Sequence, residues 1–150
     1  MIRRFLYVFV VFLLLLLMLF FLYLNNTRLV EPTVLQCYQT VKETLRKRGY
    51  SPNLMVISTK RHKWLNNLLV YFNGAASESL HLQGQAIDFI VYDVNRDGKS
   101  DGKDLDIVYK ILDQEIIVNK GGLGIYKEKG GFFNKQMIHI DCRGFRARWE

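Results

Sequence analysis

SLHLQGQAID, residues 79–88, leads from a loop into a strand-like apolar run, and HID at residues 139–141 ends a second such run. Side chains alternate between the two faces of a strand, so His139 and Asp141 share one face. Asp88 stands inside its apolar strand, where an unpaired carboxylate is costly to bury unless a metal or another cation accompanies it. The pattern therefore predicts a partner for Asp88 near the second strand.

Three side chains from these two stretches could share one divalent metal. His81 precedes the strand that carries Asp88, and Gly84 leaves room for the loop to fold back toward it. Together with His139 they would form a zinc site with an open position, where zinc makes water a nucleophile. Taken one by one, His139 could instead be a hydrogen-bonded core histidine, and Asp88 could pair with Arg61.

Hydrophobic periodicity predicts a small α+β domain with helices and strands in alternation. We expect a helix from Pro32 to the residues before Gly49, two more helices at 63–72 and 105–117, and strands at 53–58, 86–92 and 137–141. The connecting segments are predicted as a short polar linker at 25–31, a loop at 74–77, glycine-rich turns at 121–131 and a basic tail at 143–150.

An uncharged apolar run extends from Phe5 to Leu24. A helix of about 20 residues rises roughly 30 Å, enough to cross the hydrocarbon core of a bilayer. A cleavable signal peptide is the alternative, but its apolar stretch is typically about 7–15 residues long and ends at a small-residue cleavage site. Arg3 and Arg4 precede the run, so the positive-inside rule places the N-terminus in the cytoplasm.

The chain is therefore predicted as a single-pass membrane protein in two parts. Residues 1–26 form a cytoplasmic stub and a transmembrane signal anchor, and residues 27–150 form one domain in the periplasm or outside the cell. The chain has 21 Lys and Arg and 14 acidic residues, and all but Arg3 and Arg4 lie beyond the anchor, so the domain carries a net charge of +5. This charge favours anionic surroundings such as wall polymers or lipid headgroups, whereas the outward placement argues against nucleic acid as a partner.

Cys37 and Cys142 are the only cysteines. In an oxidising compartment two cysteines can pair, and this pair would close a long loop. Sequence does not show whether their Cα atoms come close enough, so pairing stays open.

A second motif, DVNRDGKSDGKD, occupies residues 93–104. It fits the twelve-residue calcium loop, with oxygen donors at the expected positions and glycine at the sharp turn. The donors would be Asp93, Asn95, Asp97, the backbone carbonyl of Lys99, Asp101 and Asp104. The final position holds Asp instead of the more usual Glu, as in dockerin loops. The alternative is a polar turn that joins a strand to a helix.

The string S-x-H-x-x-G-x-A-x-D at 79–88, followed by H-x-D at 139–141, resembles the zinc D-alanyl-D-alanine peptidases, with the murein endopeptidase K-like branch as the best match. The resemblance extends from about residue 33 to the end of the chain. It includes STKR at 58–61, GLGIY at 122–126 and the closing RGFRARW at 143–149.

This resemblance implies a small antiparallel sheet backed by helices, with zinc held by His81, Asp88 and His139. It implies hydrolysis of peptide bonds in peptidoglycan stem peptides or their cross-links. Arg61 would orient a substrate carboxylate or stabilise the developing oxyanion, and a structural pair with Asp88 is the alternative for this residue.

The chain departs from its relatives at one catalytic position. Several relatives place a glutamate three residues before the last zinc histidine, or a histidine two residues before it, whereas this chain has Gln136 and Met137. Asp141 is the best substitute, because a carboxylate two residues along the strand could take and return a proton. Asp141 could instead hydrogen-bond a ligand histidine, which would leave the base unidentified.

The sequence thus predicts a membrane-anchored zinc peptidase of the cell wall, of endopeptidase or D,D-carboxypeptidase type. A cell-wall peptide-binding protein of the same fold with impaired catalysis is one alternative, because the usual base is missing. A calcium-dependent interaction module is another.

Overall fold

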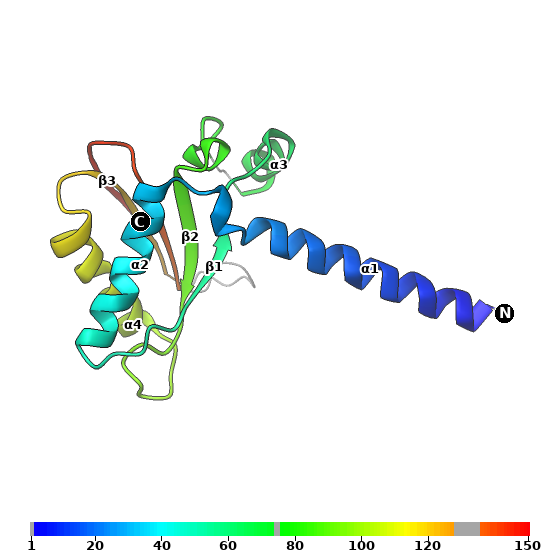
Figure 1. The fold of residues 1–150 in the computed structure, drawn as a ribbon, viewed down its shortest axis with the longest axis horizontal. Helices are drawn as coiled ribbons and strands as arrows, with labels where there is room; N and C mark the ends of the chain where they lie inside the picture. The colour runs from blue at the N-terminus through cyan, green and yellow to red at the C-terminus, as the bar shows by residue number, and fades with distance from the viewer. Residues whose placement is uncertain (1, 74–75, 128–135) are drawn as a thin grey trace.

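The structure, a computed structural model, describes residues 2–73, 76–127 and 136–150 (Figure 1). Its helices are α1 (Ile2–Leu24), α2 (Pro32–Lys47), α3 (Lys63–Asn73) and α4 (Gly102–Ile111), with 3-10 turns η1 (Thr27–Leu29) and η2 (Leu80–Gln83) and a π-helical turn η3 (Leu112–Ile116). Its strands are β1 (Leu54–Ser58), β2 (Ala86–Val91), β3 (Gly121–Tyr126), β4 (Met137–Asp141) and β5 (Arg146–Trp149).

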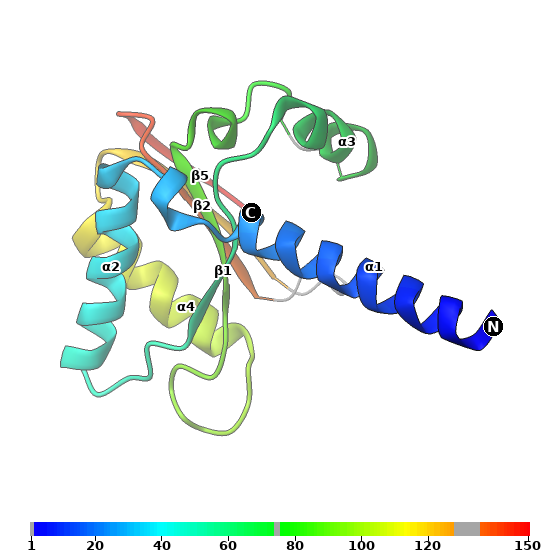
Figure 2. The ribbon, with the colours of Figure 1, turned by 45° about the vertical axis from the view of Figure 1, so that its right-hand side comes forward.

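The strands form one sheet in the order β1-β2-β4-β3-β5. All neighbours pair antiparallel except β3 and β5, which are parallel. Figure 2 shows α2 and α4 on one side of the sheet and α1 and α3 on the other. The predicted α+β fold with a small, mainly antiparallel sheet backed by helices is confirmed.

The hydrophobic core lies between the sheet and the pair α2 and α4. Alternation along the central strands turns Ile87, Phe89, Ile138 and Ile140 toward this core, where all four are fully buried. The opposite face of the same strands therefore remains for polar groups, and the candidate site lies there.

Helix α2 confirms the sequence prediction closely. Pro32 lies at the first helical position, where its missing N–H costs nothing. The buried residues of the helix are the predicted ones, Val34, Tyr38, Val41 and Leu45. After the helix ends, Gly49 takes a left-handed backbone conformation with φ of +79°.

Helix α4 begins three residues before the predicted start at Leu105 because of its N-terminal cap. The Asp101 side chain accepts a hydrogen bond from the Lys103 N–H, and the Asp104 side chain accepts one from the Asp101 N–H. This reciprocal capping box allows a helix to begin at Gly102 despite the low helix propensity of glycine.

The glycine-rich segment from residue 121 was predicted as turns, and that prediction is wrong for residues 121–126, which form β3. Residues 128–131 of the predicted segment lie outside the described part of the chain, as do Gly74 and Ala75 of the predicted loop. In β3, Gly124 pairs with His139 on one side and with Trp149 on the other. A Cβ at Gly124 would collide with the indole ring of Trp149, so glycine is what lets this ring reach across β3.

The predicted basic tail at 143–150 is also wrong in part, because Arg146–Trp149 form the edge strand β5. Asp113 accepts hydrogen bonds from Arg146 Nη1 at 2.7 Å and Arg148 Nε at 2.5 Å. Hydrogen bonds from Arg146 and then Arg148 hold the pKa of Asp113 below its ordinary value. Arg146 and Arg148 thus hold β5 against η3, the turn that contains Asp113.

Helix α1 is long and apolar enough to cross a membrane, and all but its last residues are exposed (Figure 1). The predicted linker after it is folded: the Glu31 N–H donates to the Gly84 carbonyl at 2.9 Å, and Gln85 Nε2 donates to Glu31 Oε1 at 2.8 Å. Gly84 has a φ of +77°, and a Cβ there would collide with the Leu29 carbonyl oxygen.

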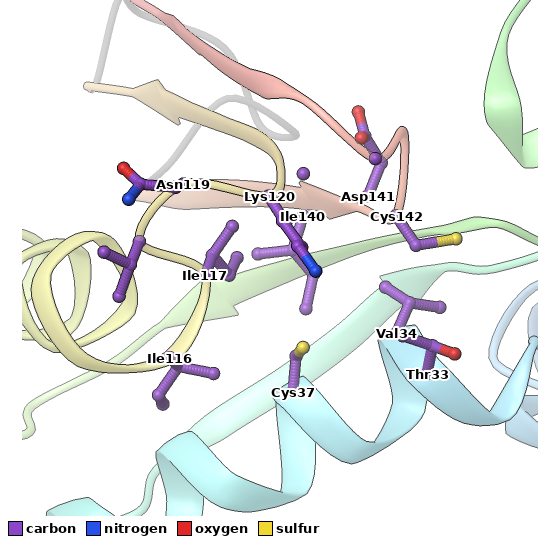
Figure 3. Close-up of a pocket in the computed structure, with 13 residues that line it drawn as sticks. Thr33, Val34, Cys37, Ile116, Ile117, Asn119, Lys120, Ile140, Asp141 and Cys142 are labelled. Carbon is purple, nitrogen blue, oxygen red and sulfur yellow. The ribbon is translucent and has the colours of Figure 1, made fainter.

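A cavity of about 520 Å³ opens between α2, the segment that follows η3 and the end of β4 (Figure 3). Cys37 and Cys142 both line this cavity, and both are free thiols. Burial raises the pKa of each thiol.

We expect Gly124→Ala to destabilise the fold by about 1–3 kcal/mol, the usual cost of an overpacked site. The added methyl group would displace Trp149 and loosen β5. Gly102→Ala is the matched control, because a Cβ there meets nothing within 4 Å. Urea unfolding of both variants measures the difference, and equal midpoints would contradict the packing described for Gly124.

Candidate metal centre

One row of residues crosses the sheet on the face opposite the core. Strand pairing aligns Ser58 with Asp88, Asp88 with His139, His139 with Gly124, and Gly124 with Trp149. Each of the five strands contributes one residue, so the row is fixed by backbone hydrogen bonds. Stretches that are distant in sequence therefore meet at positions set by strand register.

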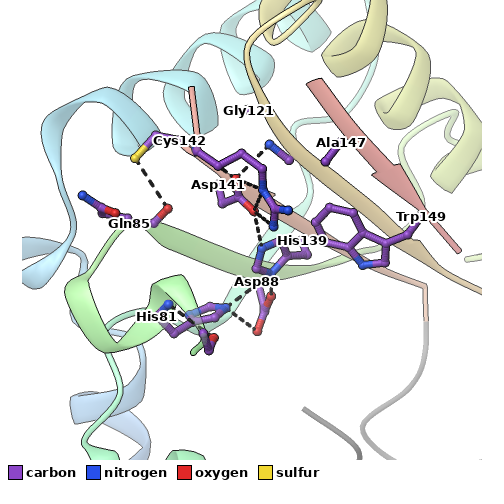
Figure 4. A network of polar contacts seen from close by, with 12 residues as sticks. His81, Gln85, Asp88, Gly121, His139, Asp141, Cys142, Ala147 and Trp149 are labelled. Atoms are coloured by element: carbon purple, nitrogen blue, oxygen red, sulfur yellow. Dashed lines mark hydrogen bonds and ion pairs between the residues drawn. The ribbon is translucent and has the colours of Figure 1, made fainter. Parts of the chain in front are cut away.

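His81, Asp88 and His139 converge at the centre of this row (Figure 4). Asp88 Oδ1 lies 2.7 Å from His139 Nδ1, and Asp88 Oδ2 lies 3.1 Å from His81 Nε2. The two imidazole nitrogens are 3.4 Å apart. One ligand atom from each residue lies within 4.8 Å of the others, which is close enough to share a metal ion.

His81 is held in a single orientation by the turn that carries it. Ser79 caps η2, and Gly84 ends it in a left-handed conformation. The imidazole Nδ1 lies 2.6 Å from the Thr59 carbonyl oxygen, to which it can only donate. Burial is the main cause that lowers the pKa of His81, so the ring is neutral at pH 7 and Nε2 carries a bare lone pair.

His139 lies between two carboxylates. Its Nδ1 faces Asp88, and its Nε2 lies 3.2 Å from Asp141 Oδ2. Burial alone would lower the pKa of His139, but the hydrogen bonds to Asp141 and Asp88 raise it to about 9. Trp149 covers the ring, with centroids 5.3 Å apart.

The Asp88 side chain is only 8 % exposed, so its charge needs partners. Burial alone would raise the pKa of Asp88, but His81 and His139 together lower it well below its ordinary value. Arg61 Nη2 donates to Asp88 Oδ2 at 2.6 Å, and Arg61 Nε donates to Ser58 Oγ at 2.8 Å. The structural pair between Arg61 and Asp88, one of the two alternatives for Arg61, is therefore present.

Asp141 is surrounded by hydrogen-bond donors. Its Oδ1 accepts from the Gly122 N–H at 2.8 Å, and the Arg143 guanidinium contacts both carboxylate oxygens, with Nη2 2.6 Å from Oδ2. A Cβ at Gly122 would collide with this carboxylate. Burial alone would raise the pKa of Asp141, but His139 and Arg143 lower it far below its ordinary value, which makes this carboxylate a weak base.

The donor set fits a zinc ion. With Nδ1–H committed to Thr59, neutral His81 has no proton to offer Asp88, so its Nε2 lone pair faces a carboxylate oxygen 3.1 Å away. Two facing lone pairs repel each other unless a cation lies between them. Two imidazole nitrogens and one carboxylate are a ligand set that zinc accepts, and the remaining nitrogen of each ring is fixed by an acceptor, as is usual for ligand histidines.

A protein family described as peptidoglycan L,D-endopeptidase MepK matches residues 22–149 of the chain. The chain belongs to this family. The match begins in the last turn of α1 and covers every strand and every residue of the candidate site. It confirms the predicted resemblance at the level of the zinc D-alanyl-D-alanine peptidase superfamily. A search among curated proteins gave no match to the chain.

The loop at 93–104 closes on itself through backbone N–H groups. Asp104 is fully buried; its Oδ1 accepts from the N–H groups of Val94 and Asn95 at 2.7 and 2.9 Å, and its Oδ2 accepts from the Asp101 N–H at 3.0 Å. Other oxygens of the predicted calcium ligands also accept hydrogen bonds from backbone N–H groups. Asp93 Oδ1 and Oδ2 accept from Asp97 and Gly98, Asn95 Oδ1 accepts from Asp97, and Asp97 Oδ1 accepts from Lys99. Within residues 2–73, 76–127 and 136–150, only His81, Asp88 and His139 come together as a group of three metal-binding side chains. Calcium binding by the loop stays a prediction.

The sequence did not identify three residues that hold the candidate ligands in place. Thr59 supplies the carbonyl for His81, Arg143 neutralises Asp141, and Trp149 covers His139. Arg143 also lies under the Trp149 ring, 4.9 Å from its centroid. All three lie in strings that carry the family resemblance, Thr59 in STKR and Arg143 and Trp149 in RGFRARW, but these strings do not show which side chains they contact.

Proposed function

We propose that this chain is a membrane-anchored zinc peptidase that hydrolyses L,D peptide bonds of peptidoglycan. The observation that carries the proposal is the convergence of His81, Asp88 and His139, with ligand atoms within 4.8 Å of one another. The family to which the chain belongs supports the substrate class and, through its description, the type of bond.

In this proposal His81 Nε2, His139 Nδ1 and one oxygen of Asp88 hold the zinc. Zinc bound there would lower the pKa of a water molecule and polarise the scissile carbonyl. His139 gives up its Nδ1 proton when the metal binds, because only a deprotonated nitrogen is a ligand. Arg61 holds the Asp88 carboxylate in place through its 2.6 Å ion pair.

Of the two roles considered for Asp141, we propose the positioning role. Its oxygens are engaged by Arg143, Gly122 and His139, and its depressed pKa is unsuited to taking a proton near pH 7. A carboxylate behind a ligand histidine fixes the tautomer and the orientation of the ring and raises metal affinity. The general base is then a group other than Asp141.

We further propose the placement that the sequence predicted. Residues 1–26 form the cytoplasmic stub and anchor, and residues 27–150 form the peptidase domain in the periplasm or outside the cell. The match of α1 to the length and composition of a membrane span supports the anchor. An outward-facing domain would meet its peptidoglycan substrate directly.

The purified full-length chain is expected to release peptides from peptidoglycan sacculi, and a chelator should abolish the release until zinc is restored. We expect His81→Ala to reduce turnover by at least about 100-fold, because a zinc ligand is lost. His62→Ala is the matched control, since His62 is exposed and lies outside the cluster. Mass spectrometry of the products identifies the bond that is cut.

Binding of the sacculi without any release of peptides would contradict the peptidase and support the impaired binding protein. The departure at Gln136 is what keeps this alternative open, and the same assay decides between the two.

The Asp141→Asn variant separates the two roles of Asp141. For a positioning residue we expect zinc affinity to fall by about 10–100-fold, with turnover largely recovered at saturating zinc. Zinc titration and peptide release are measured on the same samples, with Asp106→Asn on the exposed side of α4 as the control. Unchanged zinc affinity combined with lost turnover would show that Asp141 is the base instead.

We also propose that the loop at 93–104 binds calcium and braces the junction between β2 and α4. The Asp93, Asn95 and Asp97 side chains already form the tight turns that such a loop requires, and several of their oxygen lone pairs remain available.

Calcium titration of the His81→Ala variant tests this loop without interference from the zinc site. We expect a rise in melting temperature that Asp97→Ala removes, since a ligand that binds only the folded state stabilises it. If calcium produces neither heat nor a thermal shift, the loop is a capped turn and the calcium-dependent module is excluded.

A further inference from the structure

Helix α3 presents an exposed apolar face. Trp64, Leu68, Tyr71 and Phe72 recur at the spacing i, i+4, i+7, i+8, so they lie along one side of the helix. Their exposed fractions range from 48 % to 83 %. Asn66, on the opposite side, is buried against the domain, and so is Leu65 at the edge of the apolar face. A soluble surface rarely carries so large a contiguous aromatic and aliphatic patch without a partner.

This apolar face adjoins the end of the membrane-spanning helix. Figures 1 and 2 show α3 beside the C-terminal end of α1, on the side of the domain from which α1 departs. The rings of Phe20 and Trp64 are 6.4 Å apart, and Tyr23 stacks on His62 at 5.5 Å with nearly parallel planes. The patch is therefore continuous with the surface of α1, and it lies at the level where α1 leaves the hydrocarbon region.

The charges around this face complement an anionic lipid surface. Arg28, Lys60 and Lys63 are exposed at the junction of α1 and α3. Helix α3 contains no acidic residue, and the next one along the chain is Glu78. Tryptophan and tyrosine prefer the boundary between headgroups and acyl chains, and basic residues beside them attract anionic headgroups.

We propose that α3 is an interfacial helix that inserts its apolar face into the bilayer leaflet from which α1 emerges. This inference rests on the membrane anchor of the proposed function. Insertion would lay the domain against the bilayer at a second point and fix its orientation. Asn66 Nδ2 donates to the carbonyl oxygens of Ala76 and Ser77, in the segment that precedes His81, so the inserted helix is connected to the candidate site.

The two tryptophans of the chain allow a direct test, because one lies on α3 and the other in the candidate site. The full-length chain is reconstituted in vesicles of phosphatidylcholine and phosphatidylglycerol that contain lipids brominated near the headgroup. In Trp149→Phe, where Trp64 is the only emitter, we expect the brominated lipid to remove at least about half of the emission. In Trp64→Phe, where Trp149 is the only emitter, little loss is expected.

Two further variants, made in the Trp149→Phe background, test the apolar face as a whole. Leu68→Gln should reduce the quenching of Trp64, whereas Val118→Gln, also at an exposed apolar position but away from α3, should not. Omission of phosphatidylglycerol should weaken the quenching, because the basic residues then lose their anionic headgroups; unchanged quenching would overturn the role given to these charges.

Carbonate extraction separates the failure of this proposal from the failure of the anchor. Release of the chain from the vesicles would overturn the anchor, and the interfacial helix with it. If the chain stays in the vesicles but Trp64 is quenched by aqueous acrylamide and not by brominated lipid, α3 faces water and the inference is wrong while the anchor stands. Protection of Trp64 from both quenchers would overturn it in favour of a protein partner or a second copy on this face.

Discussion

The buried carboxylate of Asp88 is the constraint on which the rest of the structure depends. It lies in the middle of an apolar strand, between two imidazoles and a guanidinium, where an unpaired charge would be very costly. Each partner comes from a different element, and each is itself held by another group. The elements of the fold that surround Asp88 therefore supply the groups that compensate its charge.

The contacts around the candidate metal centre explain why certain strand residues are glycine, which the sequence alone does not show. Gly122 and Gly124 are small because Asp141 and Trp149 occupy the space beside them. Strand β5 lies parallel to β3, and this pairing carries Trp149 over Gly124 to His139. The residues that contact the candidate ligands thus determine the composition of the strands around them.

The periodicity of the sequence predicted the helices, and the family resemblance named the candidate ligands, but neither predicted the contacts between strands. His139 and Asp141 could be placed on one face because side chains alternate along a strand, and α2 was evident from Val34 and Leu45. Strand β3 was mistaken for turns because glycine is a turn residue unless a neighbour needs its space. The edge strand β5 could not be foreseen, since its register and its attachment to Asp113 depend on tertiary contacts. The family match covers the chain but leaves the role of each site residue to be measured.

Thr59 connects the end of α1 to the candidate metal centre. Its hydroxyl donates to the carbonyl oxygen of Leu24 at the end of α1, at 2.8 Å, while its own carbonyl holds the His81 ring. With α1 in a bilayer, this pair of contacts would hold the candidate metal centre close to the end of the membrane span. A peptidase on a flexible linker could reach wall strands at many heights, whereas one held in this way would meet the strands nearest the membrane.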